Sequence, residues 1–162
     1  MISEHLDVRM TVDGRTISAR VPVRYLLCDF LRERARAGGV HVACGHGVCG
    51  ACTVAIDGIP VRACLMLAVQ AEGAAVMTVA SLAALEGDPE PRAGLTRLQR
   101  AFREHHALQC GYCTPGLLVS TALFLAQNPS PCRTQIIDHL NGHLCRCTGY
   151  ANIIAAIESV RR

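Results

Sequence analysis

The sequence predicts an α+β protein with a small sheet and one helix in residues 1–78, a linker over 79–94 and a bundle of four helices in 95–162. Two observations lead to this prediction. Apolar and polar residues alternate in the first part, as in half-buried strands, whereas apolar residues recur at helical spacing in the last part. Each of these two parts also contains a group of four cysteines.

The chain begins with a predicted hairpin. Apolar side chains alternate over 6–12, Asp13-Gly14 is a strong two-residue turn, and residues 16–21 return as the second strand. A helix is expected from 26 to 37, where apolar residues recur every three or four positions, and Gly38-Gly39 is expected to end it.

A second predicted hairpin spans residues 52–64 around the turn Asp57-Gly58, and a last strand is expected at about 75–79. Two hairpins that flank one helix make the β-grasp arrangement of a plant-type ferredoxin. In that arrangement the helix covers one face of the sheet, and the loop between the helix and the second hairpin lies at the domain edge.

This loop carries the strongest motif of the chain. Cys44, Cys49 and Cys52 have the spacing C-x4-C-x2-C, and Cys64 follows at a distance, which is the pattern of plant-type 2Fe–2S proteins. The glycines between them permit positive φ and allow backbone N–H groups to approach the sulfurs. The sequence therefore predicts that these four thiolates hold one 2Fe–2S cluster.

The predicted linker is rich in Gly, Pro and acidic residues over 86–94, which favours an exposed connection. The helices expected after it cover about 95–106, 115–126, 131–142 and 152–160. Thr114 is expected to cap the second helix and Ser130 the third, because each precedes a proline that fits the first helical turn.

A second group of cysteines lies in the turns of the predicted bundle. Cys110 and Cys113 fall between its first two helices, and Cys145 and Cys147 between its last two. Both turns can lie at one end of such a bundle, so the four thiolates can converge there. Structural zinc also accepts four cysteines, and the spacing alone leaves both metals open. The ferredoxin-like first part favours a second 2Fe–2S cluster, because only iron would extend an electron path.

The remaining cysteines are assigned no metal. Cys28 lies on the inner face of the first predicted helix and is expected to be a small buried hydrophobe. Cys132 has no partner in the pattern and is expected to be a free, partly buried thiol.

Composition and cysteine spacing argue against several classes of protein. The ten cysteines would suit a disulfide framework, but their tight groups are poorly placed for bridges, and the N-terminus shows no signal-peptide pattern. We expect metal-bound thiolates in a reducing cytoplasm. A formal charge of +3, spread over the chain, does not indicate a nucleic-acid binder. The apolar runs are shorter than the roughly 20 residues that a membrane span needs.

With both cysteine groups, the chain resembles the iron–sulfur subunit of the xanthine oxidase family of molybdenum hydroxylases. It is similar to the small subunits of bacterial carbon monoxide dehydrogenase, of quinoline, isoquinoline and nicotine oxidoreductases, and of 4-hydroxybenzoyl-CoA reductase. The matching segments are Cys44–Val54, Gln109–Gly116, Asn128–Pro131 and Leu144–Tyr150.

The resemblance implies an electron relay without catalytic residues of its own. The cluster of the helical part would lie nearer a molybdopterin, expected in its cytosine dinucleotide form, in a large subunit. The cluster of the first part would lie nearer FAD in a medium subunit. Gln109 would contact the molybdopterin and the sulfur of Cys147 would approach it. The expected assembly is a dimer of heterotrimers.

Other functions stay open on the sequence. The chain could be a free-standing, soluble two-cluster ferredoxin, although such carriers are usually strongly acidic, or a zinc-bound interaction module. The substrate of a complete complex could be carbon monoxide, an N-heterocycle, an aldehyde or an aromatic acyl-CoA.

Overall fold

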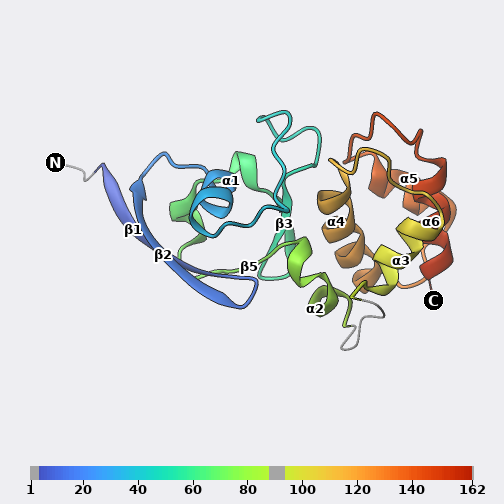
Figure 1. The fold of residues 1–162 in the computed structure, drawn as a ribbon, viewed down its shortest axis with the longest axis horizontal. Helices are drawn as coiled ribbons and strands as arrows, with labels where there is room; N and C mark the ends of the chain where they lie inside the picture. The colour runs from blue at the N-terminus through green and yellow to red at the C-terminus, as the bar shows by residue number, and fades with distance from the viewer. Residues whose placement is uncertain (1–3, 88–93, 162) are drawn as a thin grey trace.

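The sheet and the helices form two parts of the molecule that lie side by side. A computed structural model describes residues 4–87 and 94–161, and Figure 1 shows the sheet part next to the helical part. The strands are β1 (His5–Val12), β2 (Arg15–Pro22), β3 (Thr53–Ile56), β4 (Ile59–Arg62) and β5 (Ala75–Met77). They form one mixed sheet in the order β2-β1-β5-β3-β4, in which only the β1–β5 pair is parallel. Both predicted hairpins and the last strand are confirmed.

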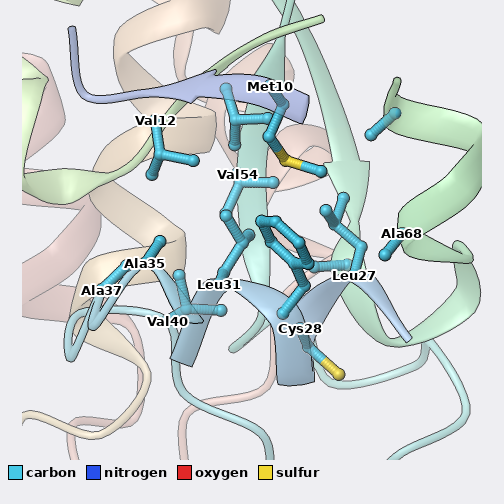
Figure 2. Packing of buried hydrophobic residues seen from close by; sticks show 14 of the residues in the cluster. Met10, Val12, Leu27, Cys28, Leu31, Ala35, Ala37, Val40, Val54 and Ala68 are labelled. Carbon is cyan, nitrogen blue, oxygen red and sulfur yellow. The ribbon is translucent and has the colours of Figure 1, made fainter. Parts of the chain in front are cut away.

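One face of the sheet is covered by the first helical segment, which consists of α1 (Leu27–Asp29) and the π-helical turn η1 (Phe30–Arg34). Figure 2 shows Leu27 and Leu31 of this segment packed with Met10 of β1 and Val54 of β3. Cys28 is buried in the same core, as predicted.

The prediction that this helix continues to residue 37 was wrong. The N–H of Ala35 donates to the carbonyl of Phe30 at 3.1 Å, and that of Ala37 to the carbonyl of Leu31 at 2.8 Å, so the turns widen beyond α-helical spacing. Arg36 then takes a left-handed conformation, with φ of 55°, and the segment ends before Gly38-Gly39.

The helical part contains α3 (Arg97–Glu104), α4 (Thr114–Gln127), α5 (Arg133–Leu140) and α6 (Ala151–Val160). They share an apolar core to which each contributes, including Phe102, Leu117, Ile136, Ile153 and Ile157. Among residues 4–87 and 94–161, no helix combines the length and apolarity that a bilayer span requires.

Two helix caps differ from prediction by one or two residues. Cys113, not Thr114, precedes α4, because Thr114 is already helical and Pro115 follows within the first turn. Cys132, not Ser130, precedes α5, where its N–H donates to the side-chain oxygen of Gln135 at 2.8 Å. Both cap positions are therefore held by cysteines.

The segment predicted as a linker contains η4 (Val79–Ser81) and α2 (Leu82–Glu86), and its residues 88–93 lie outside the described residues. Leu82 is buried in the core of the helical part. The carboxylate of Asp13, in the β1–β2 turn, accepts hydrogen bonds from the N–H and the hydroxyl of Thr78, both at 2.7 Å. These contacts fix the start of the connection against the sheet.

Strand β3 joins the two parts, because it is buried on both faces. Val54 and Ile56 face the core under α1, whereas Ala55 packs on Val119 and Leu123 of α4. Figure 1 shows α4 standing between β3 and the other helices. A strand covered on both faces carries few polar side chains, and in β3 all four residues are buried and three of them are apolar.

We expect Gly116→Ala to destabilise the contact between the two parts. A Cβ at Gly116 of α4 would collide with the backbone carbonyl oxygens of Gly50 and Ala51, which belong to the cysteine loop. The expected loss is about 1–3 kcal/mol of unfolding free energy, which outweighs the helix propensity that alanine adds. Thermal unfolding would measure it.

Gly38→Ala is the matched control, since a Cβ at Gly38 meets no atom within 4 Å. Equal stability of the Gly116→Ala and Gly38→Ala variants would contradict the tight approach of α4 to the loop.

Candidate metal centres

The first candidate centre consists of Cys44, Cys49, Cys52 and Cys64, here called the loop set. The first three lie on the loop that leads into β3, and Cys64 lies in the short helix η2 (Ala63–Leu65) after β4. Gly47 and Gly50 have φ of 82° and 77°, so the loop turns at positions that favour glycine. Cys49, Cys52 and Cys64 are buried and Cys44 is half-buried.

Backbone donors surround the first sulfur of the loop set. The N–H of Cys49 donates to the sulfur of Cys44 at 3.5 Å, and this donor, helped by those of His46 and Val48, lowers the pKa of Cys44 to about 6. Donors aimed at sulfur stabilise a thiolate, which is the form that binds a metal. Burial, together with the neighbouring Cys52 thiol, raises the pKa of Cys64 to about 11.

The second candidate centre consists of Cys110, Cys113, Cys145 and Cys147, here called the helical set. Its members come from the turn before α4 and the turn before α6. The sulfurs of Cys110 and Cys147 lie 3.5 Å apart at the surface. Burial, together with the hydrogen-bonded thiol of Cys145, raises the pKa of Cys113 to about 12. The structure therefore brings the two predicted turns together.

Around Cys145 the turn is closed by two residues that sequence reasoning missed. The sulfur of Cys145 lies 3.1 Å from the hydroxyl oxygen of Thr148, and its N–H donates to the hydroxyl of Tyr150 at 2.9 Å. Burial acts to raise the pKa of Cys145, but hydrogen bonds from Thr148 and from the backbone of Cys147 outweigh it and lower the pKa.

The arrangement in pairs suits a dinuclear cluster. Within residues 4–87 and 94–161, no three His, Cys, Asp or Glu side chains are placed to hold one metal ion. The sulfurs instead approach two by two: Cys44 with Cys49, Cys52 with Cys64, Cys110 with Cys147, and Cys113 with Cys145. Two thiolates on one tetrahedral metal with bonds of about 2.3 Å lie about 3.8 Å apart. A 2Fe–2S cluster takes four thiolates over two irons, so these residues fit it.

Three further residues with sequence-based predictions, Cys28, Cys132 and Gln109, lie outside the two sets. Cys28 belongs to the core, where burial above all raises its pKa to about 12. Cys132 is exposed and not partly buried. Gln109 is exposed immediately before Cys110, so it borders the exposed side of the helical set.

Direct contacts join the two sets. The N–H of Leu144 donates to the carbonyl of Cys49 at 2.9 Å, so the residue before Cys145 is bonded to a member of the loop set. Arg62 bridges the same contact, since its guanidinium donates to the hydroxyl of Thr53 and to the carbonyl of Gly142. In Figure 1 the loop before β3 and the turns before α4 and α6 lie along the same, upper edge of the molecule.

His143 and Tyr112 also lie at this contact. His143 is 3% exposed and lies against Gly50, and burial together with Arg62 lowers its pKa to about 3. The hydroxyl of Tyr112 donates to the carbonyl of Val42 at 2.9 Å, and its ring stacks on His41. No local pattern indicated these long-range contacts. The one signal in the sequence was the glycine that precedes each residue, Gly142 and Gly111, since glycine allows close approach of the backbone.

Family comparisons agree with both centres. A family model described as a 2Fe-2S iron-sulfur cluster binding domain matches residues 10–77, and one described as a 2Fe-2S binding domain matches residues 78–158. The two models meet next to β5, where the sheet part ends.

Curated relatives and a solved structure cover nearly the whole chain. It is 49% identical to caffeine dehydrogenase subunit gamma of Pseudomonas sp. strain CBB1, over 98% of this chain and 92% of the relative. It is 44% identical to the nicotine 6-hydroxylase small subunit of Paenarthrobacter nicotinovorans, over 96% of this chain and 89% of the relative. The crystal structure of quinoline 2-oxidoreductase from Pseudomonas putida 86 superposes with a TM-score of 0.87 at 44% identity, covering 96% of this chain and 92% of that one.

Both cysteine sets, both family models and these relatives lead to one conclusion. The chain belongs to the small iron–sulfur subunits of the xanthine oxidase family of molybdenum hydroxylases.

Proposed function

We propose that the chain holds two 2Fe–2S clusters, one on the loop set and one on the helical set. The paired approach of the sulfurs and the backbone donors at Cys44 support this assignment. We also propose the domain bounds 1–78 and 95–162, a linker between them, and a four-helix bundle formed by α3 to α6 as the scaffold of the helical set.

The chain is the electron-transfer subunit of a molybdenum-containing oxidoreductase. When bound, each cluster accepts and releases a single electron. The two cysteine sets would hold the irons, while the chain orients hydrogen-bond donors toward the sulfurs and keeps water from the buried cysteines of the loop set. The contact between Cys49 and Leu144 fixes the separation of the two sets.

We propose a direction for the relay. Gln109, Cys110 and Cys147 are exposed together, which supports an approach of the molybdopterin in a large subunit to the helical set. The loop set would then serve FAD in a medium subunit. Val48 and Leu65 are exposed apolar side chains on or beside its loop, as expected of a surface that a partner covers.

The finer features of the complex are likewise proposals. They are the cytosine dinucleotide form of the molybdopterin and a dimer of heterotrimers. We propose the cytoplasm as the location, because ten free thiols, eight of them required as metal ligands, need a reducing compartment.

Metal analysis tests the two-cluster assignment. We expect about four irons and about four acid-labile sulfides per chain, without zinc, and two resolvable 2Fe–2S signals in electron paramagnetic resonance (EPR) spectra of the reduced protein. Zinc in stoichiometric amount would show that the interaction-module function is correct. A stable monomer that carries both clusters and co-purifies with neither partner would favour a free-standing electron carrier.

Separate loss of the clusters tests the ligand sets. We expect Cys49→Ser to remove the EPR signal of the loop set and to spare that of the helical set, because the serine keeps the backbone carbonyl that Leu144 contacts. Cys44→Ser is the matched control for Cys49→Ser. It removes another ligand of the same cluster, and the hydrogen bonds of Cys44 stay within its own loop. Cys113→Ser should give the reverse pattern. Loss of both signals in Cys44→Ser would contradict separate centres.

The substrate class is tested on the purified complex. Relatives named for caffeine, nicotine and quinoline support an N-heterocycle. We therefore expect these compounds to reduce an artificial dye in the presence of the complex. Dye reduction by an aldehyde or carbon monoxide, but by none of the three heterocycles, would overturn this assignment.

A further inference from the structure

The hydroxyl of Thr148 occupies a defined place beside one sulfur of the helical set. Its oxygen lies 3.1 Å from the sulfur of Cys145, although Thr148 directly follows Cys147 in the sequence. Among the recorded contacts of this set, the sulfurs of Cys110 and Cys147 contact each other. Cys145 is the cysteine of the helical set whose sulfur lies beside the Thr148 hydroxyl.

Proton counting fixes the direction of this hydrogen bond. The N–H of Tyr150 donates to the hydroxyl oxygen of Thr148 at 3.2 Å and occupies one of its lone pairs. A metal-bound Cys145 is a thiolate and carries no proton to donate. The one proton of the Thr148 hydroxyl therefore points to the sulfur.

The surrounding turn holds both groups in place. The hydroxyl of Tyr150 accepts from the N–H of Cys145 at 2.9 Å and donates to the carbonyl of His143 at 3.0 Å. Tyr150 also has a left-handed backbone, with φ of 67°, a conformation that a non-glycine residue keeps only when its surroundings impose it. The turn thus holds the backbone on both sides of the two groups, and the N–H of Tyr150 orients the Thr148 hydroxyl.

We propose that Thr148 tunes the cluster of the helical set by donating its hydroxyl proton to the sulfur of Cys145. This inference rests on the proposed function, because it requires a cluster on that set. A donor to a ligand sulfur stabilises the added negative charge of the reduced state and so raises the reduction potential. Thr148 is a positioning residue that acts through Cys145, not a ligand.

The test compares Thr148→Val with Thr148→Ser in the intact complex. Valine keeps the shape of threonine without the hydroxyl, whereas serine keeps the hydroxyl. Redox titration followed by EPR should give a lower midpoint potential for the helical-set cluster in Thr148→Val and a value near that of the wild type in Thr148→Ser. The midpoint potential of the loop-set cluster, measured in the same sample, should be unchanged.

An unchanged helical-set potential in Thr148→Val, with its cluster retained, would overturn the proposal. So would equal shifts of both clusters, since these indicate a general change of structure. If Thr148→Val loses the cluster, pulsed EPR of the wild type after brief exchange into D2O decides. Backbone N–H groups beside the sulfur exchange as well, so the spectrum is compared with that of Thr148→Ala: a deuteron coupling that the wild type has and Thr148→Ala lacks supports the hydroxyl donor, and equal couplings overturn it. A wild type without a second signal would instead refute the proposed function.

Discussion

The close approach of the loop backbone at Gly50 and Ala51 to α4 is the constraint on which the rest of the structure depends. Gly116 has no side chain where α4 meets the carbonyls of these two residues, and any Cβ there would collide with them. This approach lets the N–H of Leu144 reach the carbonyl of Cys49. Because Cys49 and Cys145 belong to different cysteine sets, one backbone contact determines how the two candidate centres are placed.

The contact between the sheet part and α4 is stabilised mainly by buried apolar side chains, with one charged residue beside it. Ala55 packs on Val119 and Leu123, small and branched apolar side chains that allow strand and helix to meet closely. Arg62 adds a cation whose hydrogen bonds end on neutral groups of both parts. Burial, together with the charge of Arg62, lowers the pKa of the His143 imidazole to about 3, so His143 is neutral near pH 7.

The two cysteine sets differ in their exposure, and this difference suits a chain that works between partners. Three members of the loop set are buried, whereas Cys110 and Cys147 of the helical set are exposed. Burial and hydrogen bonds to sulfur are the means by which a protein sets the potential of a cluster. Backbone N–H groups supply these donors at Cys44, and a threonine hydroxyl supplies one at Cys145. One chain can therefore give its two centres different potentials.

The sequence by itself determined what depends on neighbours in the chain. Asp13-Gly14 made a hairpin, and the spacing of Cys44, Cys49 and Cys52 predicted a metal-binding loop, because turns and ligand spacing are local properties. Tertiary structure alone decided that His143 is buried and that Arg62 reaches Gly142, 80 positions away. A hydrogen bond between distant segments leaves no periodic trace in the sequence, since its geometry exists only once both segments have packed.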